Sequence, residues 1–333
     1  MSTPNEQFAT ELSADSSTGR PVQSDEARVV RELRESFVSA MKLSKEEEKR
    51  SELDSILSFI ILFIKDGSTQ SPSEPVQRKL DLIWYMVIEM AKALDKDDPF
   101  QEHLITLIMW SKEFDSLHRV LHRTEPTAAT WESYGFVNSL HASWEQLLST
   151  GTVAQQSSLA SFSAKALEAG IYGDSIGHTA LWYLREVLET DDRDKFAALL
   201  PVAVVWISHC RHKLLAFSAT KRSFGERSTA QVQTPAALTR KSGIKEPGFS
   251  MKRWLFWRRR LQELSHSSDS DVAKEGKKGF MVMINTGREL FYDVPGEARF
   301  SERLQAAMFE ELKRTGKDSV DADDIDVDVN WVD

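Results

Sequence analysis

Cysteine is almost missing from this chain of 333 residues, which contains only Cys210. A single cysteine can form neither an intrachain disulfide nor a cysteine-based structural zinc site. Cys210 stands between His209 and Arg211, a setting that could activate a thiolate. Consecutive residues of a helix, however, point about 100° apart, so the sequence favours a structural thiol over a reactive one.

Long apolar runs are also missing. The longest, residues 56–64 and 197–207, are far shorter than the roughly 20 residues that a membrane span needs. Residues 1–20 are rich in Ser, Thr, Asp and Glu, and they have neither the apolar core of a secretory signal nor the composition of a transit peptide. We therefore expect a cytoplasmic or nuclear protein that is not secreted and does not span a membrane.

Motifs for nucleotide and metal chemistry are absent or incomplete. The sequence contains no phosphate-binding loop and no G-x-G-x-x-G. Two histidine pairs have the spacing of metal ligands on a helix, His118 with His122 and His209 with His212. Arg119 follows the first of these, where a zinc protease has glutamate. We predict no cofactor and no metal, with the histidines on the surface or satisfied in the core.

Residues 173–177 read G-D-S-I-G, which matches the G-x-S-x-G elbow of nucleophilic hydrolases. That elbow needs a strand before the serine and a helix after it. The preceding segment is typical of a helix ending at Gly170, and Asp174 or Ser175 acting as a helix N-cap explains the same letters. Because each catalytic pattern fails on its context, we predict that the chain is not an enzyme.

The net charge of −9 is unevenly distributed. Residues 211–260 carry 13 Lys and Arg against Glu226 and Glu246, a net charge of +11, between two acidic regions. Such a segment can mark a surface for nucleic acid or another anion. The alternative is that its charges are solvated or paired within their own chain.

Apolar residues recur at helical spacing along most of the chain. After a disordered tail at 1–24, the first helix starts near Asp25, and Ser44 with Glu47 forms a capping box for the second. The further helices are predicted at 75–94, from Asp98 with Pro99 in the first turn, 131–148, 153–168, 176–189, 201–217, 250–264, 271–293 and 297–314. No convincing strand precedes residue 318, so we predict an all-α, irregular bundle of around ten helices.

The domain organisation follows from composition. Residues 25–315 are expected to form a single helical domain. Residues 218–247 have almost no large apolar side chain and are predicted to be a mobile basic loop within it. Residues 316–333 are predicted to be a disordered tail in which acidic and apolar residues alternate as far as Trp331 and beyond. The D-x-D-x-D at 324–328 is not a calcium loop, because its sixth position is Val329 instead of glycine.

The segment from Gly248 to Leu264 has the most marked pattern. Ser250 is a plausible N-cap, and Trp254, Trp257, Leu261 and Leu264 fall on one stripe of a helix. We expect this stripe to be buried. On the basic side, we expect Phe256 near the surface with Arg260 one turn along, within reach of a cation–π contact.

Four phrases of the sequence occur together: W-E-S-Y-G-F-V-N-S-L-H-A (131–142), L-W-Y-L-R-E-V-L-E (181–189), A-V-V-W-I (203–207) and G-F-S-M-K-R-W-L-F-W-R-R-R (248–260). Together they resemble an uncharacterised fungal (ascomycete) family of all-helical proteins filed as a domain of unknown function. The R-W-x-F-W-x-x-R phrase, residues 253–260, is the most specific of them. The chain departs from the pattern at Ala142-Ser143 and at His209-Cys210. The resemblance implies a helical fold and a fungal source, and it lends no catalytic residues.

Three classes of function follow. The leading one is a non-enzymatic helical interaction or regulatory protein with a protein partner. The second is a nuclear or nucleic-acid-associated factor that uses residues 211–260. The third is a small-molecule-binding or cryptic catalytic helical protein with a pocket between helices that is lined by Trp residues. The candidate interaction residues are Phe256, Arg258, Arg259, Arg260, Arg240, Lys241 and Trp331. We also expect the acidic tail to cover the basic segment 211–260 of its own chain.

Overall fold

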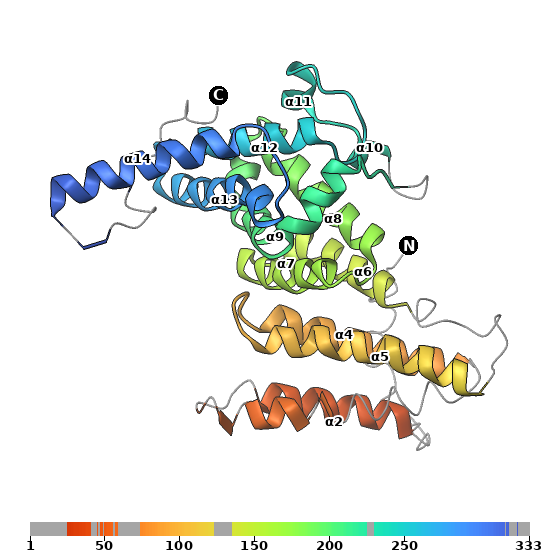
Figure 1. The fold of residues 1–333 in the computed structure, drawn as a ribbon. Coiled ribbons are helices and arrows are strands. Elements are labelled where there is room, and N and C mark those ends of the chain that lie inside the picture. The colour runs from red at the N-terminus through yellow and green to blue at the C-terminus, as the bar shows by residue number, and fades with distance from the viewer. Residues whose placement is uncertain are drawn as a thin grey trace. The chain divides into compact units, whose positions relative to one another are not determined.

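The computed structural model describes residues 25–40, most of 45–58, and residues 74–122, 135–224 and 230–316, together with Asp318, Ser319 and Ile325. In these ranges every regular element is a helix, which confirms the predicted fold class (Figure 1). None of the described helices is both long and apolar enough to cross a membrane. The chain divides into two compact units, residues 1–162 and 163–333. The prediction of a single domain at 25–315 stays a prediction, because compactness alone does not show that a unit folds by itself.

The first unit is built around α4 (Glu74–Ala93). This helix packs against α2 (Asp25–Ala40), α5 (Phe100–His122) and α6 (Phe136–Thr150). Trp84 of α4 meets the ring of Phe136 edge-to-face, with ring centroids 5.3 Å apart. Asp98 caps α5 by accepting a hydrogen bond from the backbone N–H of Phe100 at 2.8 Å. Much of the predicted capping-box helix lies outside the described residues.

The second unit has α9 (Arg193–Ala219) at its centre. Three helices pack against it: α8 (Gly173–Leu188), α12 (Met251–Leu264) and α13 (Ser270–Glu289). The unit also takes in the end of α7 (Val153–Glu168). Figure 1 shows α12 and α13 alongside α9. The buried residues of α9 occur all round the helix, as expected for a central element.

The course of α9 differs from its prediction at two places. The helix was expected to start at Pro201, because proline favours the first turn. It starts eight residues earlier, since Phe196 and Leu200 are buried and their packing outweighs the proline preference. Near the other end, Cys210 has non-helical dihedral angles (φ −136°, ψ 30°). This break divides the helix just before Arg211.

Close contact between α12 and α13 depends on two glycines of α13. A Cβ atom on Gly276 would lie 2.7 Å from the backbone nitrogen of Ser265 and 2.8 Å from the carbonyl carbon of Leu264. A Cβ atom on Gly279 would lie 3.0 Å from a methyl group of Leu261. Only glycine lets the two backbones approach this closely.

The segment predicted to be a mobile loop has more structure than its composition suggested. Its described residues include two short helices, α10 (Ala230–Gln233) and α11 (Ala237–Lys241). The side chain of Gln233 bonds both backbone groups of Phe224, nine residues earlier in the segment, at 2.9 and 2.8 Å. Four apolar residues of the segment are buried: Phe224, Val232, Ala236 and Ile244. These residues pack against the rest of the unit, while the mobility of the segment stays a prediction.

The last helix, α14 (Glu297–Thr315), buries only Glu297 and Phe300, both in its first turn. Figure 1 shows its far end extending past the other helices of the unit. Beyond it, Ile325 is buried, and its carbonyl accepts a hydrogen bond from the ammonium of Lys277 on α13 at 3.4 Å. At Ile325 the tail thus meets α13, and the predicted covering of the segment 211–260 by the tail stays a prediction.

Candidate functional site

The tryptophan stripe of α12 is buried as the sequence predicted. Ser250 caps the helix by accepting a hydrogen bond from the backbone N–H of Arg253. Trp254 and Trp257 have no exposed surface, and the ring of Trp257 meets that of Phe249 edge-to-face. The stripe is therefore part of the core of the second unit.

Arg253, which the sequence placed on the basic side of this helix, is also fully buried. Its guanidinium pairs with Glu189, the residue that ends α8, at 2.7 Å from both Nε and Nη2. The indole N–H of Trp257 donates to the same carboxylate oxygen at 2.8 Å. Two of the four phrases that carry the family resemblance, 181–189 and 248–260, thus meet in one buried ion pair.

The remaining hydrogen bonds of this pair hold the segment 218–247 in place. Nη1 of Arg253 donates to the carbonyls of Gln233 and Gly248. The other oxygen of Glu189 accepts from the backbone N–H of Ala236 at 2.8 Å. Burial lowers the pKa of Arg253, while the Glu189 charge acts in the opposite direction. The pair is enclosed on all sides, so its role is to join α8, α12 and the segment, with no access for a ligand.

The predicted interaction residues of α12 are only partly available at the surface. Phe256 is half-buried. The guanidinium of Arg260 lies over the ring of Phe196 of α9, at 5.9 Å, and not over Phe256 as predicted. Arg258 is 4% exposed and donates to the carbonyl of Pro295 at 2.7 Å. A role for Arg258 at a surface is therefore at odds with its position.

For the other candidate interaction residues, a role in binding a partner stays a prediction. Arg259 is exposed and lies 3.8 Å from Glu263 on the same helix. Arg240 and Lys241 are exposed at the end of α11. Trp331 lies outside the described residues.

Six of the described Lys and Arg residues in 211–260 form ion pairs within the chain. They are Arg211, Arg222, Lys252, Arg253, Arg259 and Arg260. Arg222, for example, bonds both carboxylate oxygens of Asp174, at 2.7 and 2.5 Å. For these six residues the structure matches the alternative that the sequence left open, in which the charges are paired within their own chain.

Ser175, the serine of the G-x-S-x-G match, lies within a helix and not on the strand-to-helix turn of a nucleophile elbow. Residues 173–177 lie in the first turns of α8, whose N-cap is Tyr172 with no side-chain cap bond. Asp174 and Ser175 are therefore inside the helix instead of capping it. Gly177 serves packing, because a Cβ atom there would lie 2.8 Å from the ring of Phe217.

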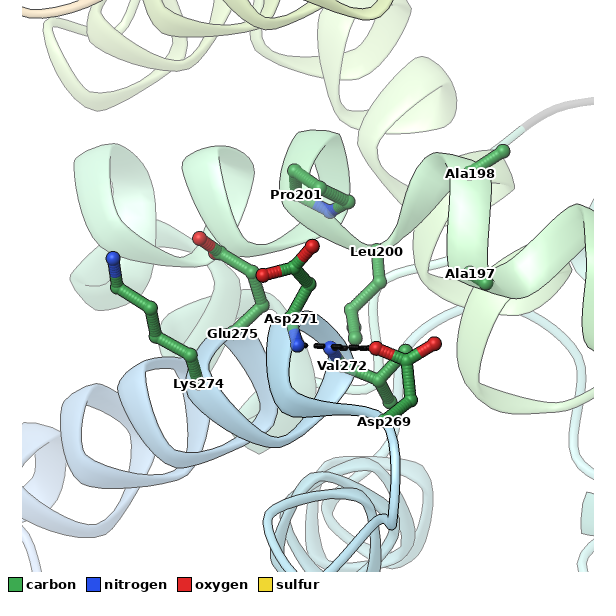
Figure 2. A pocket seen from close by; sticks show the side chains of 9 residues that line it. All are labelled: Ala197, Ala198, Leu200, Pro201, Asp269, Asp271, Val272, Lys274 and Glu275. Atoms are coloured by element: carbon green, nitrogen blue, oxygen red, sulfur yellow. Dashed lines mark hydrogen bonds between the residues drawn. The ribbon is translucent and has the colours of Figure 1, made fainter.

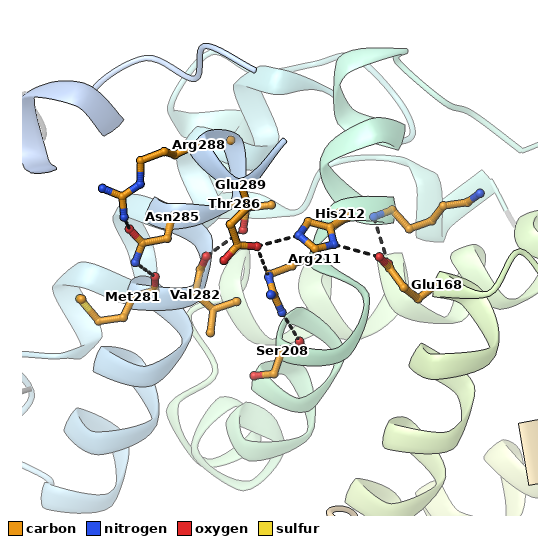
Figure 3. A network of polar contacts seen from close by, with 12 residues as sticks. Glu168, Ser208, Arg211, His212, Met281, Val282, Asn285, Thr286, Arg288 and Glu289 are labelled. Atoms are coloured by element: carbon orange, nitrogen blue, oxygen red, sulfur yellow. Dashed lines mark hydrogen bonds and ion pairs between the residues drawn. The ribbon is translucent and has the colours of Figure 1, made fainter. Parts of the chain in front are cut away.

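A half-exposed network lies just after the break in α9 (Figure 3). Nδ1 of His212 is 3.0 Å from Glu168 of α7, and Nε2 is 2.7 Å from Glu289 of α13. Arg211 donates to the same Glu289 oxygen at 2.8 Å. Partial burial acts to raise the pKa of Glu289, but the bonds from Arg211 and His212 outweigh it and lower the pKa.

Both ring nitrogens of His212 are occupied by carboxylates. Ionised carboxylates only accept hydrogen bonds, so both contacts are satisfied together when the ring is protonated. Each ring nitrogen of His212 thus already has a carboxylate partner. The carboxylates flank the ring on opposite sides, and no group of described His, Cys, Asp or Glu side chains is arranged to hold a metal ion.

The thiol of Cys210 is enclosed beside this network. Its Sγ lies 3.0 Å from the carbonyl of Trp206. Burial, with a further contribution from the charge of Glu168, raises the pKa of the thiol well above its usual value. A thiol held protonated is a poor nucleophile, which agrees with the structural role favoured from the sequence.

A groove lies between α9 and α13 (Figure 2). It measures about 500 Å³. Its apolar lining comes mainly from α9, and its polar lining comes from the start of α13. The lining residues are Ala197, Ala198, Leu200, Pro201, Asp269, Asp271, Val272, Lys274 and Glu275.

The polar groups of the groove are mostly hydrogen-bond acceptors. Asp269 caps α13 through one oxygen, which accepts from the backbone N–H groups of Asp271 and Val272. Pro201 has no N–H, so the carbonyl of Ala197 cannot receive the helical bond that residue 201 would otherwise donate. Figure 2 shows the carboxylates of Asp271 and Glu275 near Pro201, with no hydrogen bond drawn to either carboxylate. Sequence reasoning missed this site, although Pro201 inside a helical pattern was a signal.

Comparison with known proteins gives one relative and no structural precedent. The chain is 24% identical over 244 residues to a Penicillium oxalicum protein named "Oxopyrrolidines biosynthesis cluster protein G", across 64% of this chain and 68% of the relative. That finding contradicts the prediction that the chain is not an enzyme, because the relative is assigned to a biosynthetic cluster. No solved structure matches the chain.

A family model described as "Protein of unknown function (DUF3632)" matches residues 84–261. The matched range contains both phrases that meet in the Glu189–Arg253 pair, and it covers more than half of the chain. It also agrees with the resemblance seen in the sequence, which pointed to an uncharacterised fungal family. The chain therefore belongs to the DUF3632 family.

Proposed function

We propose that this protein serves a pathway of small-molecule biosynthesis and that the groove between α9 and α13 binds a small molecule carrying an ammonium or guanidinium group. The observation that carries the proposal is the lining of the groove. The lining carries three carboxylates, those of Asp269, Asp271 and Glu275, and one ammonium, that of Lys274. Such a lining favours a cation that donates hydrogen bonds.

The apolar side of the groove supports a small organic ligand over a bare ion. Leu200 and Val272 are buried beneath it, and Pro201 and Ala197 are half-buried at its wall. A volume of about 500 Å³ falls within the usual range for small-molecule sites. The geometry suits a ligand whose apolar body rests on α9 while its charged end faces α13.

The pathway role rests on the relative in Penicillium oxalicum. Its printed name assigns it to a biosynthesis cluster. We take from it only the general role in making small molecules, and nothing about the compound. Binding is the step that the groove residues support, and it is compatible with a chemical step on the bound molecule.

The binding part can be tested with a matched pair of probes. Benzylamine and benzyl alcohol share an apolar ring and differ in charge, so calorimetric titration of each reports the contribution of the cation. We expect saturable binding of benzylamine that weakens by about tenfold in the double variant Asp271→Asn, Glu275→Gln. Glu302→Gln, an exposed acid on α14, is the control and should bind like the native protein. Equal binding of both probes would contradict the proposal.

The pathway part needs a cellular test. Deleting the gene in the source organism should remove or reduce at least one small molecule in a mass-spectrometric profile. Restoring the native gene should bring it back, and the gene carrying Asp271→Asn and Glu275→Gln should not. An unchanged profile after deletion would reject the pathway role, whereas rescue by the double variant would reject the groove alone.

A helical interaction protein is the second candidate, and one observation favours it. Phe291 is completely exposed in the connection between α13 and α14, with Leu290 and Tyr292 also exposed beside it. Its φ of +53° is a costly conformation for a bulky residue. Exposed aromatic residues are typical of protein interfaces. Affinity capture with the native protein and with Phe291→Ser would test this candidate, since a partner that binds here should be lost in the variant.

A further inference from the structure

The structure leaves three neighbouring cations of the basic segment exposed. They are Arg240, Lys241 and Lys245, and none of them forms an ion pair with a residue that the structure describes. Six other Lys and Arg residues of 211–260 do form such pairs. Residues 240–245, here called the basic turn, therefore carry three positive charges that the described chain does not neutralise.

Hydrogen bonds and buried side chains define the shape of the basic turn. The backbone N–H of Gly243 donates to the carbonyl of Arg240 at 3.0 Å, and that of Ile244 donates to Thr239 at 3.2 Å. With a φ of +81° at Gly243, this is a Schellman motif that ends α11. Thr239 and Ile244 are buried on its inner side, and the carbonyl of Glu189 accepts a hydrogen bond from α11 at 3.0 Å. The turn thus has its apolar side inward and its cations outward.

Acidic residues near the turn do not offset its charge. Between residues 227 and 260, Glu246 is the sole acidic residue of the sequence. Its carboxylate bonds the ammonium of Lys252 at 2.9 Å. Glu246 is therefore already paired, although it directly follows Lys245 in the sequence. An anion that binds the turn must come from another molecule.

The exposed side chains around the turn favour one class of anion. Among the described residues of 230–260, no large apolar side chain is exposed. A protein interface has an apolar core, and a site for single-stranded nucleic acid has aromatic side chains on which bases stack. The phosphate backbone of a duplex requires neither, because lysine and arginine alone bind it.

We infer that the basic turn binds the phosphate backbone of double-stranded nucleic acid, without sequence preference. Its three cations contact about three phosphates, and each contact releases counterions. The net charge of −9 on the whole chain repels a polyanion, so the binding is weak and needs low salt. The turn shares no residue with the groove between α9 and α13, so this inference does not depend on the proposed ligand site.

Salt dependence tests the inference quantitatively. We expect fluorescence anisotropy with a labelled random-sequence DNA duplex of about 20 base pairs to report binding by the native protein. Between about 0.02 and 0.2 M NaCl, the logarithm of the binding constant should fall against the logarithm of salt with a slope of about −2.7, since each of three phosphates contributes about 0.9. The double variant Arg240→Gln, Lys241→Gln should bind more weakly, with a slope of about −0.9.

Arg259→Gln provides the matched control. Arg259 is an exposed arginine of the same basic segment that pairs with Glu263, and its removal should leave the slope unchanged. An equal loss in Arg259→Gln would overturn the assignment to the basic turn, as would a double variant that binds like the native protein. Urea midpoints of all three proteins should agree, because the replaced side chains are exposed.

Further probes identify the class of partner. A duplex RNA of the same length should bind with a similar slope, because the contacts are to phosphates. Equally strong binding of poly-glutamate would overturn the inference in favour of an acidic protein as the partner. Tighter binding of a single strand than of the duplex would also overturn it.

Discussion

Two ion networks of the second unit use similar groups at different depths. Glu189 and Arg253 have no exposed side-chain surface. In the network around His212, the side chains of Glu168, His212, Glu289 and Arg211 are each 32–40% exposed. Both networks join elements that are far apart in the sequence, but only the first is completely buried from solvent.

The difference in depth changes what each network does. Once a charge is enclosed, removing its partner leaves an uncompensated charge in a medium of low dielectric constant, which is strongly destabilising. A half-exposed charge that loses its partner is solvated again, so the loss is small. We therefore expect the buried pair to control folding and the His212 network to adjust stability with pH and salt.

Removing one partner of the buried pair should have the largest effect. Arg253→Met keeps most of the side-chain volume but leaves Glu189 charged and enclosed, at a cost of about 3–5 kcal/mol in the free energy of unfolding. Arg211→Met is the matched change in the exposed network and should cost less than about 1 kcal/mol. Urea denaturation of both variants measures the difference. Equal losses would show that depth does not separate the two networks.

Two tryptophans of α12 isolate the hydrogen bond to Glu189. Trp257 donates to that carboxylate, whereas the N–H of Trp254 has no hydrogen-bond partner among the described residues. Both rings are fully buried, so changing either to Phe removes a similar volume. Trp257→Phe should destabilise by about 1.5–3 kcal/mol more than Trp254→Phe, because it removes a bond to a charged group. Thermal and urea midpoints of the two variants measure this difference. Matching midpoints would show that Trp257 contributes through packing alone.

Acid should weaken the exposed network through Glu289. The folded-state pKa of this residue is lowered below its usual value, so its contribution is complete above the unfolded pKa of about 4.3 and is lost as pH falls through the folded value. Because the side chain is 40% exposed, the contribution should stay under about 1 kcal/mol. Urea midpoints from pH 7 to pH 3 should fall less steeply in Glu289→Gln than in the native protein. Parallel curves would remove Glu289 from the acid dependence.

Salt should produce the smallest and most selective change. Raising NaCl from 0.05 to 0.5 M screens exposed charges much more than buried ones. The stability difference between the native protein and Glu289→Gln should shrink by a few tenths of a kcal/mol. The stability difference between the native protein and Arg253→Met should not change with salt. A salt effect of the same size in both would mean that water reaches the buried pair.

Local pattern was enough to predict the helices and the tryptophan stripe. The stripe of α12 is readable because its apolar residues repeat with the helical period and Ser250 marks the start. The predicted helix at 153–168 coincides with α7 for the same reason. Periodicity is a property of neighbouring residues, so no knowledge of the rest of the chain is needed.

Contacts between residues that are far apart in the chain could not be predicted from the sequence. Arg253 was counted only as one cation of the basic segment, because its partner Glu189 is 64 positions away and no local feature connects them. The groove was missed for a similar reason, since its two sides come from α9 and the start of α13. The segment 218–247 looked mobile by composition, yet four of its scattered apolar residues find partners in the core.

The thiol of Cys210, at the break in α9, can be used to measure local opening of the protein. The thiol is fully enclosed, and it is the only one in the chain. A thiol reagent can therefore modify the native protein only when this region opens, and the labelling rate measures the free energy of that opening. A rate matching global unfolding would place the break inside the cooperative core. A faster rate would identify residues 211–219 as a unit that detaches first, taking His212 away from both of its carboxylates.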